Sequence, residues 1–202
     1  ESMQLNIYKM DYEEVKTYDV GMKPHPRFPK QQKLKAVKPL LSDLIDSVEL
    51  YLSKNNSPKL RYNIETKSLP AGDIKYHPAP GEFVELLMAV IKEKKMEDRV
   101  IIQSFDFRSL IYLHEKYPAV KTAMLIEDSE VKDFEGQLKA LGFIPDVYSP
   151  NYTMVDEDLV KQCHEKGMKV IPWTVNHKKQ IKKLVKLGVD GIITDYPDLF
   201  KK

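Results

Sequence analysis

The sequence predicts an α/β fold built from parallel βα units. Short apolar runs rich in β-branched residues alternate with longer segments whose apolar residues recur at helical spacing. A glycine follows three of these helical segments, at Gly142, Gly167 and Gly188. Two arrangements fit this alternation: an open doubly wound sheet, or an eight-stranded barrel with two strands absent. The phosphate-binding glycine motifs of doubly wound folds, G-x-G-x-x-G and G-x-x-x-x-G-K, do not occur.

The elements follow from this pattern in chain order. Residues 1–38 contain a Pro-rich stretch and are expected to form a loop; so long an initial loop leads us to expect further chain before it. The predicted strands are residues 60–66, 99–104, 121–126, 146–148, 169–174 and 191–194. The predicted helices are residues 37–54, 80–95, 107–116, 129–141, 156–166 and 177–187. Asp156 and Asn176 stand where the N-caps of the last two helices are expected.

Composition and charge limit the partners, membrane segments and disulfides that we expect. The chain has 202 residues with 32 basic and 30 acidic side chains, and a net charge of +2 gives no reason to expect nucleic acid or an anionic membrane as partner. No apolar run approaches the roughly 18 residues of a transmembrane helix. The single cysteine, Cys163, excludes an internal disulfide and is expected to be a buried apolar residue. These data do not indicate a cellular compartment.

The strongest local signal for chemistry is at the end of the first predicted strand. Side chains alternate along a strand, so Asn63, Glu65 and Lys67 share one face. In a barrel, polar groups at the carboxyl end of a strand are typical of an active site. Glu65 would then bind a metal, and Lys67 would bind a phosphate. The alternative is a Glu-Lys pair that faces solvent at a strand end.

Other candidates follow later strands. Gln103 or Ser104 could reach a ligand at the barrel mouth, or Ser104 and Asp106 could cap the next helix. Trp173, the single tryptophan, would wall a binding pocket or fill the core. The five histidines show no metal-binding spacing, and no nucleophile motif occurs.

Four segments together resemble the glycerophosphodiester phosphodiesterase family, in the order of its motifs. They are Ile64-Glu65-Thr66-Lys67, Gln103-Ser104-Phe105-Asp106, Trp173-Thr174-Val175-Asn176 and the decapeptide from Gly188 to Pro197. The resemblance covers nearly the whole chain and implies a TIM-type (β/α) barrel that is incomplete, with about six of the eight strands present in residues 1–202.

The resemblance also implies an activity, namely metal-dependent hydrolysis of a small-molecule glycerophosphodiester to sn-glycerol 3-phosphate and an alcohol. Glu65 maps onto a ligand of the divalent cation, Mg²⁺ or Ca²⁺. Lys67 maps onto the phosphate-binding residue, and Gln103 and Trp173 are expected to line the substrate cavity.

The chain departs from the family in three motifs. Family members carry a His-Arg-Gly strand, a Pro-Glu-Asn segment and a His-Asp strand, none of which occurs here. We therefore expect the catalytic histidine pair upstream of Glu1 and an inactive fragment. An inactive ligand-binding or interaction module on the same barrel, or another diesterase of the superfamily, remains an alternative. Open barrel edges predict low stability or self-association.

Overall fold

The centre of the molecule is a parallel sheet whose strands follow one another in chain order. The structure, a computed structural model, describes residues 5–129 and 133–200. The sheet has five strands in the order β1-β2-β3-β4-β5. They are β1 (Tyr62–Glu65), β2 (Val100–Ser104), β3 (Lys121–Ile126), β4 (Val147–Pro150) and β5 (Lys169–Val170). Glu65 pairs in register with Gln103, so the carboxyl ends of β1 and β2 lie side by side.

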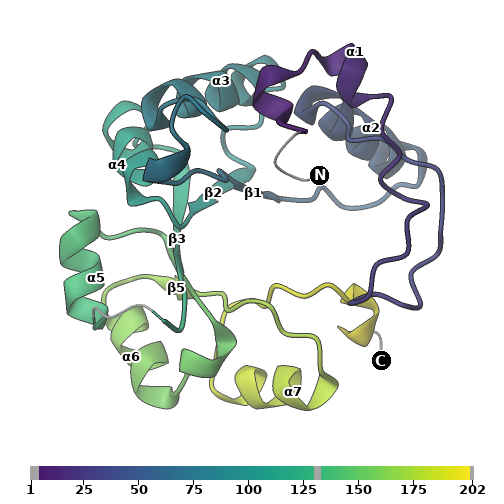
Figure 1. Cartoon of the computed structure of the whole chain (residues 1–202). Coiled ribbons are helices and arrows are strands. Elements are labelled where there is room, and N and C mark those ends of the chain that lie inside the picture. The colour runs from purple at the N-terminus through teal and green to yellow at the C-terminus, as the bar shows by residue number, and fades with distance from the viewer. Residues whose placement is uncertain (1–4, 130–132, 201–202) are drawn as a thin grey trace.

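Helices connect the strands and lie outside them, as expected for βα units (Figure 1). The α-helices are α1 (Tyr12–Val15), α2 (Leu41–Lys54), α3 (Pro80–Glu93), α4 (Phe107–Lys116), α5 (Phe134–Leu141), α6 (Glu157–Glu165) and α7 (Lys178–Lys186). Short 3-10 helices are η1 (Ile7–Lys9), η2 (Pro70–Gly72), η3 (Tyr152–Met154) and η4 (Pro197–Phe200). Within the described ranges, no helix is long and apolar enough to cross a membrane.

The apolar faces of these elements form two adjoining clusters. Ile45 and Ile91 of α2 and α3 pack with Ile102 of β2 in one cluster. Tyr148 of β4 belongs to the second, which also includes the predicted buried thiol, Cys163. Burial raises the pKa of that thiol to about 12. Side chains alternate along β1 and β2, so their other faces are left for polar residues.

Most predicted elements agree with the observed ones, but both ends of the chain differ. The predicted initial loop, residues 1–38, contains η1 and α1. The helix predicted from residue 37 begins at Leu41, because Pro39 disfavours helical backbone at the residue before it. Of the helix predicted at residues 129–141, residues 130–132 lie outside the described residues and α5 begins at Phe134.

The other differences are near the carboxyl terminus. β5 ends at Val170, although the apolar run predicts a strand to residue 174. Pro172 has no N–H to donate to a neighbouring strand. The sixth predicted strand, residues 191–194, is not regular β-structure. Its backbone still follows the preceding segment, because the Ile193 N–H donates to Pro172 O and the Val175 N–H donates to Ile193 O, both at 2.9 Å.

Helix ends test the predicted caps. The three glycines adopt left-handed backbone angles, with φ of 83°, 78° and 86° at Gly142, Gly167 and Gly188. Asp156 caps α6, because its Oδ1 accepts a hydrogen bond from the Leu159 N–H at 2.8 Å. The predicted cap at Asn176 is wrong. Its Nδ2 donates instead to Asp195 Oδ2 at 2.8 Å, and His177 occupies the cap position without a side-chain bond.

A long extended loop, residues 20–40, joins the two ends of the molecule; we call it the strap. In Figure 1 it runs from α1 to the carboxyl-terminal segment and back to α2. Its two legs lie side by side, because the Val20 N–H donates to Ala36 O at 2.8 Å. Gly21 permits this approach, since a Cβ there would lie 1.8 Å from Leu34 O. At the tip, the ring of Phe28 lies 6.2 Å from that of Tyr196.

Candidate active site

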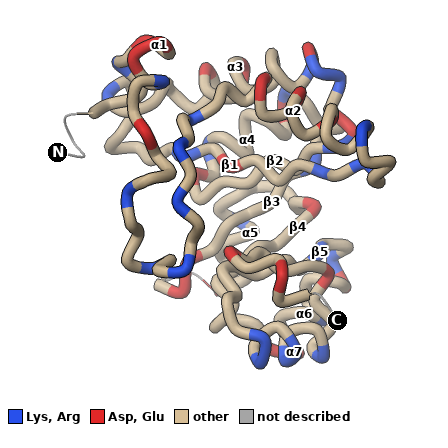
Figure 2. The backbone as a smooth tube through the Cα atoms, turned by 90° about the vertical axis from the view of Figure 1, so that its right-hand side faces the viewer, with Lys and Arg blue, Asp and Glu red and all other residues tan. Residues whose placement is uncertain are grey.

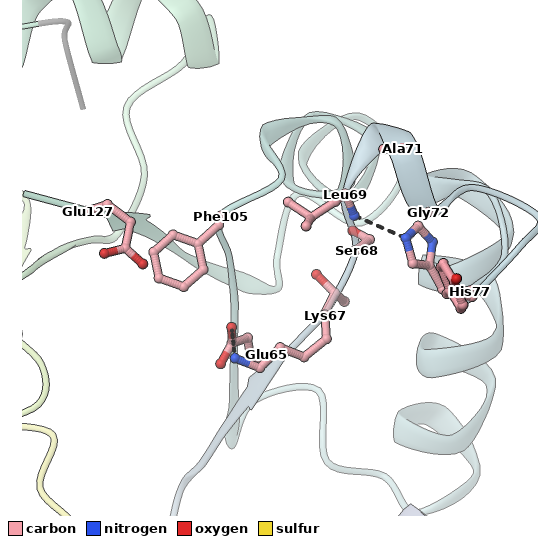
Figure 3. A pocket seen from close by; sticks show the side chains of 11 residues that line it. Glu65, Lys67, Ser68, Leu69, Ala71, Gly72, His77, Phe105 and Glu127 are labelled. Carbon is pink, nitrogen blue, oxygen red and sulfur yellow. Dashed lines mark hydrogen bonds and ion pairs between the residues drawn. The ribbon is translucent and has the colours of Figure 1, made fainter. Parts of the chain in front are cut away.

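A cavity of about 620 Å³ opens at the carboxyl end of β1. Most of its wall comes from the chain that follows β1, from Glu65 to Gly72 and again at Tyr76 and His77. Phe105, after β2, and Glu127, after β3, complete the lining (Figure 3). Three neighbouring strand ends therefore contribute to one cavity, which is where parallel α/β folds bind ligands.

Glu65 and Lys67 lie together in this cavity, as the alternation along β1 predicts. Lys67 Nζ is 2.8 Å from Glu65 Oε1; the lysine side chain is 78% exposed and the glutamate side chain 20% exposed. At this distance the two groups form an ion pair. Glu65 Oε1 is nevertheless buried and has no hydrogen bond. Burying a carboxylate oxygen without hydrogen bonds is unfavourable, so this atom is well suited to bind a cation or ligand.

Phe105 and Glu127 form the part of the lining across from Lys67 and Leu69 (Figure 3). The edge of the Phe105 ring meets the Trp173 ring, with 5.4 Å between centroids and an angle of 88°. Trp173 Nε1 donates to Ser149 O at 2.9 Å. Trp173 thus contacts Phe105 but is not itself among the residues that line this cavity.

Gln103 lies on the same face of the sheet as Glu65 but outside the cavity lining. Its side chain is buried, and its Oε1 accepts a hydrogen bond from Asn63 Nδ2 at 2.7 Å. This bond joins the polar faces of β1 and β2.

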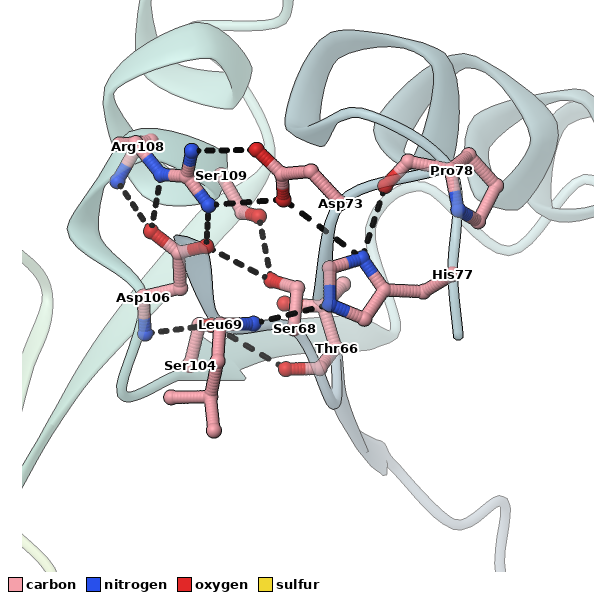
Figure 4. A network of polar contacts seen from close by, with 10 residues as sticks. All are labelled: Thr66, Ser68, Leu69, Asp73, His77, Pro78, Ser104, Asp106, Arg108 and Ser109. Atoms are coloured by element: carbon pink, nitrogen blue, oxygen red, sulfur yellow. Dashed lines mark hydrogen bonds and ion pairs between the residues drawn. The ribbon is translucent and has the colours of Figure 1, made fainter. Parts of the chain in front are cut away.

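A polar network fixes the loop between β1 and α3 (Figure 4). Arg108 at the start of α4 donates to both oxygens of Asp73, at 2.7 and 3.0 Å. It also donates to both oxygens of Asp106, at 2.9 and 2.7 Å. The Ser68 hydroxyl donates to Asp106 Oδ2 at 3.0 Å. Arg108 therefore links a loop of the cavity wall to the N-terminus of α4.

These contacts set the charge states of the network. Burial alone would raise the pKa of Asp106, but hydrogen bonds from Arg108 and Ser68 outweigh it and the pKa is lowered. The hydrogen bonds from Arg108 likewise lower the pKa of Asp73. Both carboxylates are charged at neutral pH and share one guanidinium.

His77 is the histidine of the cavity wall, and both of its ring nitrogens contact backbone groups. Nε2 accepts from the Leu69 N–H at 3.0 Å, so Nδ1 carries the proton and donates to Pro78 O at 2.8 Å. The ring also lies against Gly72, where a Cβ would come within 2.5 Å of Nε2. His77 therefore holds the loop in place and is not positioned to act as a general acid or base.

Sequence reasoning found part of this site and missed the rest. Glu65 and Lys67 are in the cavity, and Asp106 caps α4 by accepting from the Arg108 N–H at 3.2 Å. Glu127 was missed, although an acidic residue directly after the buried strand at residues 121–126 was an available signal. The link from Arg108 to Asp73 had no local signal, because the two residues are 35 positions apart.

The donors in the cavity suit a hard divalent cation. Glu65 and Glu127 supply carboxylate oxygens, one of which is buried without a hydrogen bond. Mg²⁺ is commonly bound through one or two carboxylates together with substrate phosphate oxygens. No group of three or more His, Cys, Asp or Glu arranged to hold a metal occurs in the part of the chain that the structure describes. The carboxylates present therefore fit such an ion but do not enclose it.

Comparisons with known proteins point to one family. The sequence profile of the glycerophosphoryl diester phosphodiesterase family matches residues 2–199. A glycerophosphodiester phosphodiesterase of Caldanaerobacter subterraneus is 34% identical over 188 residues, which cover 92% of this chain and 68% of that protein. One from Bacillus subtilis is 27% identical and is covered to 62% of its length.

Solved structures agree in fold. A putative glycerophosphoryl diester phosphodiesterase from Silicibacter pomeroyi superposes with a TM-score of 0.78 at 29% identity, over 95% of this chain and 66% of that one. A phosphodiesterase from Oleispira antarctica, solved in complex with the product sn-glycerol-3-phosphate, gives 0.72 at 20% identity, over 95% of this chain and 69% of that one. The chain thus spans about two thirds of the length of these relatives.

Proposed function

The chain belongs to the glycerophosphoryl diester phosphodiesterase family, and from this premise we propose that its cavity binds the phosphate of a glycerophosphodiester for hydrolysis to sn-glycerol 3-phosphate and an alcohol. The observation that carries the proposal is the Glu65–Lys67 pair at the carboxyl end of β1. It presents an anionic and a cationic group to the same cavity.

Glu65 and Glu127 are the residues that would hold a divalent cation, Mg²⁺ or Ca²⁺. When bound, such an ion would offset negative charge on the phosphate oxygens. Glu65 Oε1 supports this assignment, because it is buried without a hydrogen bond and the Lys67 amino group 2.8 Å away belongs to an exposed side chain that can move aside. The Oleispira structure, with its product complex, supports sn-glycerol 3-phosphate as the phosphate-bearing product.

Lys67 would bind the phosphate as a mobile positive charge. Its side chain is largely exposed at the cavity, so the amino group can move from Glu65 to an incoming anion. Phe105, whose ring contacts Trp173, would form an apolar wall for the rest of the substrate. Gln103 would act indirectly, without touching the substrate. Its hydrogen bond to Asn63 would keep the polar face of the sheet in place beside Glu65.

Titration calorimetry with sn-glycerol 3-phosphate tests the proposal without requiring turnover. We expect binding in the presence of Mg²⁺ or Ca²⁺, and about a tenfold or greater loss in Glu65→Gln, equivalent to at least about 1.4 kcal/mol. Glu82→Gln removes the same charge from an exposed position on α3 and should bind as the parent does. Equal affinity in Glu65→Gln and the parent would contradict the proposed role of Glu65.

Assays of glycerophosphodiester hydrolysis by the same three proteins then separate an enzyme from a binding module. Release of sn-glycerol 3-phosphate that depends on Glu65 supports the hydrolase. Binding without release would favour the alternative of an inactive ligand-binding module, because His77 is held by backbone contacts on both ring nitrogens.

A further inference from the structure

The strap carries a concentration of positive charge that the composition of the whole chain conceals. It contains six Lys and Arg residues, and no Asp or Glu occurs from residue 20 to residue 42. The six are Lys23, Arg27, Lys30, Lys33, Lys35 and Lys38. The whole chain has a net charge of +2, so the remaining residues sum to −4. Figure 2, which views the molecule from this side, shows the basic residues along both legs and at the tip.

Apolar side chains are interleaved with these cations and are also exposed. Met22, Leu34 and Val37 are 50%, 58% and 42% exposed, and Val20 and Leu40 have similar exposure. Large apolar side chains that are exposed together with cations are typical of a surface that contacts a partner. A basic surface with interspersed apolar groups suits the boundary between lipid headgroups and acyl chains.

The strap has a defined conformation. Its legs are joined by the bond from Val20 to Ala36, and its tip is anchored on the carboxyl-terminal segment. There Arg27 Nη2 lies 3.8 Å from Asp195 Oδ2, and Phe28 contacts Tyr196. Docking would therefore cost less conformational entropy than it would for a disordered basic segment.

We propose that the strap docks the protein on a bilayer that contains anionic phospholipids. This proposal is independent of the proposed hydrolase activity, because it uses no residue of the cavity. It differs from the expectation drawn from the net charge, because the net charge does not show how the charged residues are distributed. Nucleic acid is the less suitable partner, because the strap's one aromatic ring besides His25 already contacts Tyr196 and is not presented for base stacking.

Vesicle co-sedimentation tests the proposal, with vesicles of phosphatidylcholine alone and of phosphatidylcholine mixed with phosphatidylglycerol. The parent chain should bind the mixed vesicles and release them as salt is raised. The triple variant K30E/K33E/K35E should lose at least about a hundredfold in partition coefficient, because each cation near an anionic surface contributes about fivefold and the new carboxylates are repelled. The matched control, K179E/K182E/K186E on exposed positions of α7, makes the same change in charge and should retain binding.

Three results would overturn the proposal. One is failure of the parent to bind the mixed vesicles. Another is an equal loss in both triple variants, which would indicate attraction by general charge. The third is tight binding of an oligonucleotide, or formation of a dimer through the strap detected by sedimentation, together with no vesicle binding. Far-UV circular dichroism of both variants establishes that a loss of binding is not a loss of fold.

Discussion

Replacing Arg108 by methionine should destabilise the protein chiefly by leaving one buried carboxylate without its cation. Asp106 is only 6% exposed, and Arg108 donates three of its hydrogen bonds, two from the side chain and one from the backbone. Removing one partner of a fully buried ion pair costs about 3–5 kcal/mol. The Arg108 side chain is 39% exposed, which weakens the pair, so we expect a loss of about 2–3 kcal/mol in the free energy of unfolding at pH 7.

The loss of stability in Arg108→Met should depend on pH, and its direction follows from the pKa of Asp106. The native pKa of Asp106 is lowered from its ordinary value, so its contribution to stability is present above the unfolded pKa and is lost as pH falls through the native pKa. In Arg108→Met the carboxyl can be protonated instead of being buried as an unpaired charge. The difference in stability between parent and variant should therefore shrink as pH is lowered below about 4.

Urea unfolding followed by circular dichroism at pH 7 and at about pH 3 measures both quantities. Adding Asp106→Asn to Arg108→Met should restore about 1 kcal/mol or more, because a neutral amide needs no counter-charge. Arg61→Met is the matched control at an exposed position and should stay within about 0.5 kcal/mol of the parent. An equal loss at both pH values, with no rescue by Asp106→Asn, would refute the reasoning.

Three further predictions concern other parts of the molecule. Glu49 has its pKa lowered to about 2, first by hydrogen bonds from Arg99, so its contribution is present above pH 4.5 and lost toward pH 2. Glu49→Gln should cost about 1–2 kcal/mol at pH 7, after allowance for its partial exposure, and should flatten acid denaturation over that range. Gly21→Ala should separate the legs of the strap by forcing a Cβ onto Leu34 O, which hydrogen exchange at the Val20 amide would detect as faster exchange. Glu65→Gln should change the midpoint of thermal unfolding little or raise it, because Glu65 Oε1 is buried without a hydrogen bond and its ion pair is with a largely exposed lysine, whereas a large drop would show that its role is structural.

Local patterns were sufficient to predict most of the fold. The strand at residues 121–126 and the helix at residues 107–116 match the structure residue for residue, because each is a clear periodic run bounded by a cap or turn. The failures occurred where a distant partner decides the conformation. Asn176 looks like a helix cap in the sequence, but Asp195, 19 positions later, binds its side chain instead. The early end of β5 has a local cause instead, because Pro172 interrupts a run that is otherwise apolar.

The candidate site also has one part that the sequence predicts and another that it does not. Glu65 and Lys67 were predictable because alternation along a strand depends only on neighbouring residues. The network around Arg108 was not, because it joins a loop and a helix that become neighbours only after the sheet has formed. The roles assigned to Gln103 and Trp173 stay predictions, since neither lines the cavity directly.

The order of strands in the sheet also bears on how the molecule would come apart under force. Among the described residues, each strand pairs with the next one along the chain, so no strand there is threaded between partners that come from distant parts of the sequence. A pull on the carboxyl terminus would first detach the strap tip, held by Arg27 and Phe28, and then remove one βα unit after another. Extension should therefore proceed in steps of one strand and one helix, and its first step should be abolished by cutting the contact between the strap and Tyr196.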